Sequence, residues 1–227
     1  MTVIADILKT TVEQLAVGSC RSNLLWQYAL DGRATPRMVA SYLESLKYMV
    51  GSTAPCLARA RDSARALGNF DLARFFEEKL AEEVGHDDWA RADIAALDAS
   101  NGVAVGDPVE GIVDLIAFTR DTIDRDPELY LAYMFWAEYM TTLVGGEFSR
   151  ALVHRCGIPK QALTCLDRHV ELDLAHADEG MDMLDRFVTD PRKVDAMRAV
   201  VTTAAGLFDR ACGQMVEFDL PADKLAS

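Results

Sequence analysis

The stretch His169-Val-Glu-Leu-Asp173-Leu-Ala-His176 carries polar residues at positions i, i+4 and i+7. On an α-helix this spacing places His169, Asp173 and His176 along one face, about two turns long. Two imidazoles and a carboxylate on one stripe are ligands typical of a transition metal bound through nitrogen and oxygen. Because two of the chain's four histidines lie here, the sequence predicts a metal-binding helix.

A third histidine, His86, follows two acidic residues in the segment Glu82-Glu83-Val-Gly-His86. On a helix Glu83 and His86 would lie one turn apart. Helical Glu-x-x-His is the pattern by which bundle-type di-iron proteins supply a carboxylate and an imidazole to one metal pair. Charged residues on a helix usually form a solvated face. Both motifs together, in a chain so poor in histidine, favour metal binding instead.

A carboxylate within an apolar run is the third part of the predicted site. Glu138 lies in the segment 129–146, which is long enough to cross a bilayer but contains tyrosines and threonines, so we expect a buried helix. An isolated buried carboxylate is costly, and burial would raise its pKa. A metal ion would supply the opposite charge. The alternatives for Glu138 are a water-filled edge or an arginine partner.

A fourth carboxylate would balance a di-iron centre, and Glu44 is the candidate, in Tyr42-Leu-Glu44-Ser-Leu-Lys47-Tyr48. Glu44 and Lys47 could equally form an exposed i, i+3 ion pair. If Lys47 or Tyr48 faces the metals, the lysine could pair with a substrate carboxylate and the tyrosine could be redox-active. The usual role of such a tyrosine is packing in the core.

Composition limits the class of partner. The chain has 227 residues, of which 50% are hydrophobic and 26% charged, as expected for one globular domain with a sizeable core. The net charge of -13 argues against a nucleic-acid partner, which would need a basic face, and against docking on anionic lipid. Five cysteines without CxxC spacing indicate reduced thiols in a cytoplasmic protein, and the first residues lack the basic region of a signal peptide.

Helical periodicity runs through the chain, and no segment shows sustained strand alternation. Thr35-Pro36, Asp107-Pro108 and Asp126-Pro127 each combine a capping residue with a proline at the first helical position. Pro55 should kink or break its helix. We predict one all-helical domain of about seven helices over 1–218, with a frayed tail at 219–227. The helices are expected over about 2–16, 22–30, 36–66, 69–97, from 107, from 126 to 146 or on to 156, 159–188 and 190–218, with a linker at 99–106.

These pieces resemble the haem-oxygenase-like di-iron oxidase and oxygenase superfamily. The segment Glu82-Glu83-Val-Gly-His86-Asp-Asp-Trp89-Ala-Arg-Ala-Asp93 is similar to the EE-x-GH-x-x-W pattern of the iron-containing redox enzymes in that group. The resemblance covers about residues 35 to 188, and the His-x3-Asp-x2-His piece is its most specific part. It implies a haem-oxygenase-like bundle without haem. The implied metal ligands are Glu44, Glu83, His86, Glu138, His169, Asp173 and His176, with Glu82 as an alternative to Glu83.

The resemblance implies an enzyme that holds two iron ions and uses dioxygen as co-substrate. The implied reactions are N-oxygenation of amines, oxidative C–C cleavage of fatty or amino acids, and desaturation. If Lys47 turns inward, a carboxylate-bearing small molecule is favoured as substrate; if it turns outward, as most lysines do, an amine is equally suitable. A reductant or redox partner and a homodimer are both compatible with the sequence.

Three other functions are open to this sequence. Thiaminase-type hydrolases are similar in fold and use a cysteine nucleophile, for which Cys156 and Cys165 are candidates, although buried cysteines usually pack in a core. A cofactorless enzyme of the pyrroloquinoline-quinone synthase type would use basic residues around an acidic substrate, and these are sparse here. A non-catalytic iron-binding protein of the ferritin type would repeat Glu-x-x-His on two helices. His-x3-Asp-x2-His replaces the second copy here and favours the oxidase.

Overall fold

A computed structural model describes residues 4–103 and 106–220, apart from the side chains of residues 174–178. All regular structure in these ranges is helical, as predicted. The elements are α1 (Ile4–Ser22), α2 (Leu24–Leu30), α3 (Pro36–Ala66), α4 (Phe70–Glu83), α5 (Asp87–Asn101), α6 (Glu110–Arg125), α7 (Pro127–Met140), the π-helix η1 (Thr141–Gly145), α8 (Gly146–Cys156), the 3-10 turn η2 (Lys160–Ala162), α9 (Thr164–Phe187), the 3-10 turn η3 (Pro191–Lys193) and α10 (Val194–Glu217).

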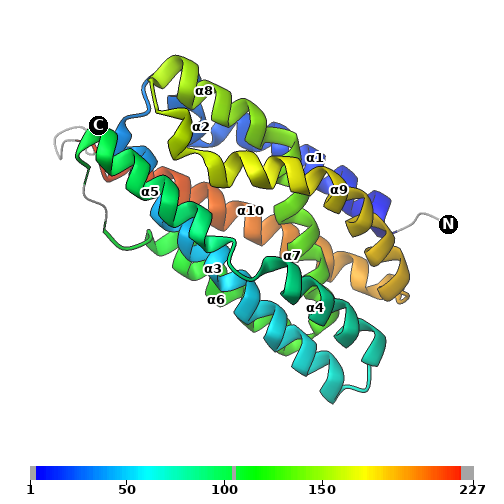
Figure 1. Ribbon diagram of the computed structural model, residues 1–227. Helices are drawn as coiled ribbons and strands as arrows, with labels where there is room; N and C mark the ends of the chain where they lie inside the picture. The colour runs from blue at the N-terminus through cyan, green and yellow to red at the C-terminus, as the bar shows by residue number, and fades with distance from the viewer. Residues whose placement is uncertain (1–3, 104–105, 221–227) are drawn as a thin grey trace.

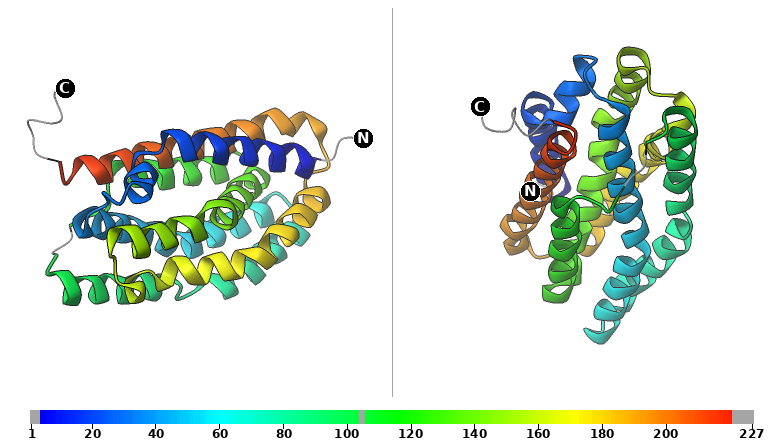
Figure 2. Two further views of the ribbon diagram at one scale, coloured as in Figure 1. Left: turned by 90° about the horizontal axis from the view of Figure 1, so that it is seen from above. Right: turned by 90° about the vertical axis from the view of Figure 1, so that its left-hand side faces the viewer.

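The helices form one elongated bundle (Figure 1), in which α3 packs against α4, α5 and α6. α1 and α10 run side by side along one edge (Figure 2), and α1 also contacts α9. α7 lies in the interior, between α9 on one side and α6 and α10 on the other. The central helix is therefore the apolar run around Glu138, as expected from its composition.

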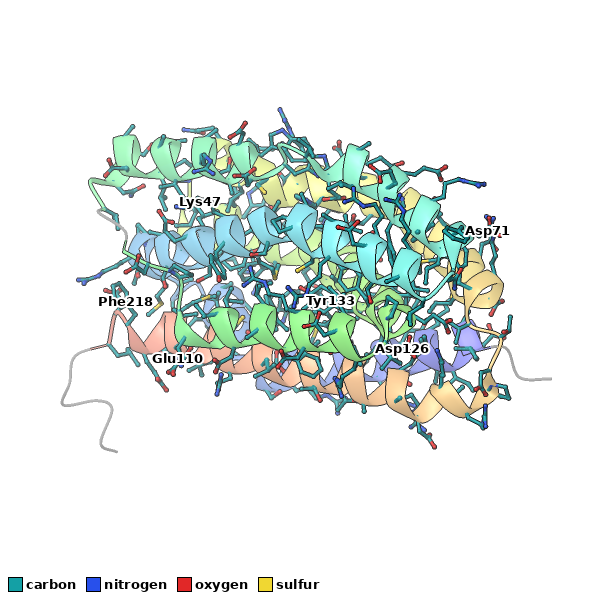
Figure 3. The ribbon with its side chains drawn as sticks, turned by 90° about the horizontal axis from the view of Figure 1, so that it is seen from below. Lys47, Asp71, Glu110, Asp126, Tyr133 and Phe218 are labelled. Atoms are coloured by element: carbon teal, nitrogen blue, oxygen red, sulfur yellow. The ribbon has the colours of Figure 1, made fainter. Side chains whose placement is uncertain are left out.

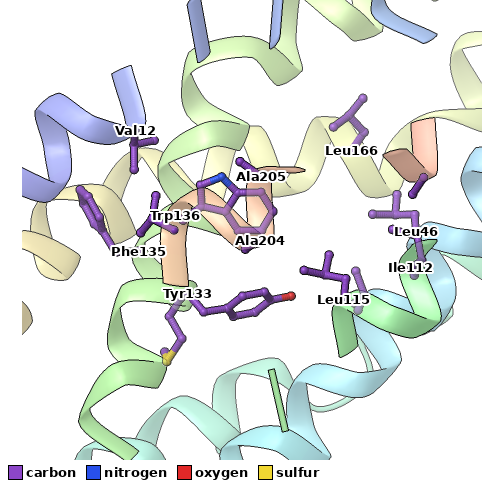
Figure 4. Packing of buried hydrophobic residues seen from close by; sticks show 14 of the residues in the cluster. Val12, Leu46, Ile112, Leu115, Tyr133, Phe135, Trp136, Leu166, Ala204 and Ala205 are labelled. Carbon is purple, nitrogen blue, oxygen red and sulfur yellow. The ribbon is translucent and has the colours of Figure 1, made fainter. Parts of the chain in front are cut away.

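The core around α7 is aromatic, and the residues 129–136 are all buried. Figure 4 shows the Trp136 ring beside Ala204 and Ala205 of α10, while the Tyr133 ring points towards Leu115 of α6. None of the helices in the described ranges is long and apolar enough to span a bilayer. All five cysteines are free thiols.

Three of the predicted helix starts are confirmed by their capping hydrogen bonds. The side chains of Thr35, Asn69 and Asp126 each accept a hydrogen bond from a backbone N–H two or three residues further on, at 3.0–3.2 Å. The start predicted at Asp107 is wrong, because the helix begins at Glu110 without a side-chain cap.

The structure contradicts a break at Pro55, one of the two outcomes predicted there, and it contradicts the predicted end of the first helix at about residue 16. α3 continues unbroken through Pro55, and α1 continues through Gly18 to Ser22. A proline costs a helix about 3 kcal/mol and a glycine about 1 kcal/mol. In α3 the buried residues continue past Pro55 as far as Ala64, and their burial outweighs the local cost of the proline.

The single helix expected over 69–97 is divided at the point that matters for function. α4 ends at Glu83, and Gly85 has a φ of +91°, a left-handed conformation that glycine adopts without strain. α5 begins at Asp87. His86 therefore lies in a turn between two helices, and not on a continuous helix with Glu83.

The later segments follow the predicted order with shifted boundaries. The helix from Asp126 continues as α7, η1 and α8 to Cys156, whereas Pro159 precedes only a 3-10 turn and α9 begins at Thr164. At the C-terminal end, Asp219 accepts a hydrogen bond of 2.5 Å from the Thr35 hydroxyl, so this part of the predicted tail is anchored. The rest of that tail, 221–227, lies outside the described residues.

Candidate metal centre

Three of the predicted ligands come together in the interior of the bundle. They are Glu83 at the end of α4, His86 in the turn that follows, and His169 on α9. One ligand atom of each lies within 4.8 Å of the others. The side chains of Glu83 and His86 are only 15% and 13% exposed. A single metal ion at this point would have two nitrogens and a carboxylate within reach.

The left-handed turn at Gly85 directs His86 towards α9. The His86 ring stacks on Trp89, with 4.1 Å between the ring centroids, and meets His169 edge-on at 5.5 Å. Trp89 also contacts the edge of His169, at 5.6 Å. The indole thus holds both imidazoles in place.

The hydrogen bonding of the two imidazoles fits a metal site. His169 Nδ1 lies 2.8 Å from the Cys165 carbonyl oxygen, which can only accept, so Nδ1 carries the proton and Nε2 keeps its lone pair for a metal. His86 Nδ1 is buried 3.2 Å from Glu83 Oε2, yet it has no hydrogen-bond partner within the described part of the chain. A buried nitrogen without a partner is unusual. A metal ion would satisfy both this nitrogen and the adjacent carboxylate.

The cluster borders an interior cavity of about 200 Å³. Glu83 and His169 line this cavity, and so do two further predicted ligands, Asp173 of α9 and the half-buried Glu138 of α7. The rest of the wall is mostly apolar and aromatic. The structure therefore gathers five of the seven predicted ligands in one region. The side chain of the sixth, His176, lies outside the described residues.

A buried lysine on the same wall is a feature that the sequence reasoning missed. Lys79 is 5% exposed, and its Nζ donates to Glu82 Oε2 at 2.9 Å and to Glu179 Oε2 at 2.5 Å. Burial lowers the pKa of Lys79, but these carboxylates and nearby Glu138 raise it above the ordinary value, so the amine is protonated. Because Glu82 pairs with Lys79, Glu83 is the member of the Glu82-Glu83 pair that faces the cluster. The sequence did contain a sign of this ion pair, because Lys79 lies three residues before Glu82, about one helical turn away.

A second missed residue, Asp93 of α5, positions the metal-binding helix. Its carboxylate is fully buried and accepts hydrogen bonds from the Thr164 N–H at 3.0 Å, the Thr164 hydroxyl at 2.6 Å and the Cys165 N–H at 2.7 Å. α9 has no side-chain cap from its own N-cap residue. Asp93 therefore caps α9 from another helix, one turn before His169. Burial raises the pKa of this carboxyl, and the hydrogen bonds only partly oppose that effect.

Glu44, Lys47 and Tyr48 are not brought to the cavity. Glu44 forms an ion pair with Lys47, and all three residues line a separate pocket between α3 and α5. Figure 3 shows Lys47 between these helices, apart from Tyr133 in the interior. Glu44 is turned roughly 200° around α3 from Tyr42. The α3 residues that line the cavity are Tyr42, Leu46, Met49, Val50, Thr53 and Leu57.

The two candidate cysteine nucleophiles also lie away from the cavity wall. Burial and the neighbouring Asp93 raise the pKa of Cys165 to about 12, and burial raises the pKa of Cys156. A thiol with a raised pKa is a poor nucleophile, because only the thiolate reacts. The cavity wall does contain Cys20 and Cys212, but burial raises the pKa of both, to about 12 for Cys212.

Comparison with protein families gives one match that spans most of the chain. The model of the iron-containing redox enzyme family matches residues 41–207, a range that includes every predicted ligand. No curated protein matches the chain.

Solved structures with a similar fold have low sequence identity. A domain of unknown function with a haem-oxygenase-like fold from Shewanella denitrificans OS217 is 22% identical, with a TM-score of 0.82 over 92% of this chain and 90% of that one. A CADD-like protein of unknown function from Nostoc punctiforme PCC 73102 is 15% identical, with a TM-score of 0.70 over 94% of this chain and 99% of that one. A TenA homologue from Pseudomonas syringae pv. tomato DC3000 is 17% identical, with a TM-score of 0.67 over 92% and 91%. These likenesses show a haem-oxygenase-like fold.

Proposed function

Because the chain belongs to the iron-containing redox enzyme family, we propose that it is a non-haem di-iron enzyme that uses dioxygen to oxidise a small organic molecule. The observation that carries the proposal is the convergence of Glu83, His86 and His169 on one point beside an interior cavity. Bound ferrous iron would supply the activation of dioxygen. The reaction proposed is an N-oxygenation, an oxidative C–C cleavage or a desaturation.

The proposed ligands form two groups. Glu83, His86 and His169 would hold one iron ion. Glu138 and Asp173, which line the cavity, would hold a second ion. His176 joins the second group in the proposal because it lies three residues after Asp173 on the same helix. Glu44 is left out of the set, because it lies on the side of α3 that faces away from the cavity.

The residues around the ligands set their orientation and exclude water. The Cys165 carbonyl holds His169 in the tautomer that presents Nε2. Lys79, bonded to Glu82 and Glu179, joins α4 to α9 beside the ligands. Burial raises the pKa of Tyr130 far above its ordinary value, so the phenol remains protonated near the acidic ligands. The mostly apolar and aromatic wall of the cavity would limit side reactions of a reactive site with water.

In this proposal Lys47 has no role in binding the substrate. Its ion pair with Glu44 and its place in a separate pocket remove the basis for expecting a substrate carboxylate at that lysine. A thiaminase-type reaction is disfavoured by the raised pKa values of Cys156 and Cys165.

Two substitutions one turn apart on α9 test this function. The protein is loaded anaerobically with ferrous iron and mixed with dioxygen, and oxygen uptake is followed with an electrode. We expect His169→Ala to lose the uptake because it removes a ligand. Cys165→Ala should retain it, since the backbone carbonyl that orients His169 stays. Full uptake by His169→Ala would contradict the proposed site, and loss of uptake by Cys165→Ala with its iron still bound would show that the thiol itself is needed for the oxidation.

A further inference from the structure

The π-helix η1 joins α7 to α8, and all three elements lie beside the metal-binding helix α9 (Figure 1). In a π-helix the backbone hydrogen bonds run from residue i to i+5, and such turns are rare and frequently lie at functional sites. Side chains reinforce this one. The Thr141 hydroxyl donates to the Ala137 carbonyl at 2.9 Å. The Thr142 hydroxyl likewise donates to the Tyr139 carbonyl at 2.8 Å, so the turn is held in place next to α9.

Gly145, the last residue of η1, is in close contact with α9. A methyl group at this position would lie 2.8 Å from Val170 Cγ2 and 3.4 Å from Leu166 Cδ1. Carbon atoms that are not bonded pack at about 3.5–4.0 Å, so the contact with Val170 leaves no room for a side chain. Gly145 is buried, and it shares the cavity wall with Leu166 and His169. The missing side chain therefore lets η1 pack directly on the part of α9 that carries His169.

Val170 cannot make room by turning its side chain. A valine in a helix has one strongly preferred rotamer, because two heavy atoms branch from its Cβ. A methyl group at position 145 would therefore move the backbone of α9 away from η1. Restoring an ordinary carbon–carbon contact requires a displacement of about 0.7 Å.

A displacement of this size would be felt at the metal centre. His169 immediately precedes Val170 in α9, so it moves with Val170. Its two partners in the cluster, Glu83 and His86, belong to the end of α4 and to the turn that follows, and they would stay behind. Distances between a metal and its ligands vary by only about 0.2 Å at a well-formed site. A shift of His169 alone would therefore weaken the binding of a metal ion by all three residues.

We propose that Gly145 is a positioning residue of the metal centre. Because it lacks a side chain, η1 approaches α9 at Val170, and this contact sets the distance of His169 from Glu83 and His86. The inference rests on the proposed function, and it adds to that function the element that holds the metal-binding helix at its working distance.

The iron affinity of two neighbouring glycine variants tests the proposal. Ferrous iron is titrated without oxygen, in competition with a coloured chelator. Gly145→Ala should weaken the binding of the tightly held iron about 10–100-fold, as expected when support for a ligand is lost. Gly146→Ala is the matched control and should bind iron as the unsubstituted protein does, because its methyl group would lie 3.5 Å from Arg150 Nη1 and 3.8 Å from Val170 Cγ1. Unchanged affinity in Gly145→Ala, or an equal loss in both variants, would overturn the proposal.

Gly111→Ala separates positioning from a general loss of stability. Gly111 of α6 packs against α10, where an added methyl group would lie 2.9 Å from the backbone of Ala211. Neither helix carries a proposed ligand. This variant should therefore unfold at a lower urea concentration, while its folded form keeps the iron affinity of the unsubstituted protein. If its affinity falls as far as that of Gly145→Ala, the effect is one of stability and the proposal is wrong.

Val170→Ala tests the same contact from the side of α9. It leaves a gap opposite Gly145 and should weaken iron binding about fivefold, whereas the double variant with Gly145→Ala and Val170→Ala refills the gap and should restore the affinity. This comparison decides the question even if Gly145→Ala alone does not fold. A double variant that binds iron no better than Val170→Ala would contradict the proposal.

Nuclear magnetic resonance of the metal-free protein detects the displacement itself. The Trp89 ring contacts the edge of His169 at 5.6 Å, so its indole N–H signal depends on the position of that imidazole. The signal is identified by its loss in Trp89→Phe. It should move in Gly145→Ala, return in the double variant and stay in place in Gly146→Ala; an unmoved signal in Gly145→Ala would refute the displacement. This readout contains no iron, so it decides the role of Gly145 even if the unsubstituted protein binds no iron and the proposed function fails.

Discussion

Replacing Asp93 with alanine should destabilise the protein by about 3 kcal/mol, because it removes three hydrogen bonds of roughly 1 kcal/mol each. These bonds come from the Thr164 N–H, the Thr164 hydroxyl and the Cys165 N–H. The N–H of Cys165 is buried, so water cannot replace the lost carboxylate there. The substitution also removes the buried charge of the Asp93 carboxylate, which is itself unfavourable, and this offsets part of the loss of stability. The free energy of unfolding is measured by urea denaturation, followed by circular dichroism.

Asp98→Ala on the same helix is the control for this substitution, because that side chain is exposed. Its effect should lie within about 0.5 kcal/mol of zero, as for most surface substitutions. The Asp93→Ala protein should also bind ferrous iron more weakly, since the cap lies one turn before His169. A loss of stability below about 1 kcal/mol, or one equal to that of the control, would refute the capping role of Asp93.

The pH dependence of this difference follows from the raised pKa of Asp93. The folded state binds the proton more tightly than the unfolded chain, in which the pKa is about 3.9. This contribution to stability is present below that pH and is lost as the pH rises through the folded pKa. The stability difference between the unsubstituted protein and Asp93→Ala should therefore shrink as the pH rises through the acid range. A difference that grows instead would contradict the raised pKa.

Four further substitutions separate the roles of other residues. Lys79→Met should lower the free energy of unfolding by about 1 kcal/mol, a small effect because the two glutamate partners are half-exposed. This difference from the unsubstituted protein should disappear as the pH rises through the raised pKa of Lys79. Urea titrations at several pH values measure both effects. Glu44→Ala should keep its iron and its oxygen uptake, whereas a loss of iron on metal analysis would make Glu44 a ligand after all. Asp173→Ala and His176→Ala should each abolish iron-dependent oxygen uptake while the circular dichroism spectrum stays helical.

The features predicted correctly from the sequence are those that depend on local geometry. The caps at Thr35, Asn69 and Asp126 follow from residues within one turn of each other. His169 and Asp173 lie on the cavity side of one helix because a four-residue spacing on a helix is fixed by its period. The position of Glu44 could have been inferred in the same way, since it lies on the opposite side of α3 from Tyr42.

The features that were missed depend on contacts between distant segments. Asp93 acts through Thr164 and Cys165, and Lys79 acts through Glu179 on another helix, so neither role is visible within one turn of sequence. The break at Gly85 was missed because one glycine costs a helix only about 1 kcal/mol. The packing of α5 against α3 and α9 decides where the chain turns.

The iron content of the protein tests the central claim most directly. The chain is loaded with ferrous iron without oxygen, unbound metal is removed, and iron per chain is measured by elemental analysis. We expect two irons per chain, or one held tightly and one held weakly, and loss of the tightly held iron in His86→Ala. A chain that stays free of metal, or takes up only zinc, would contradict the account.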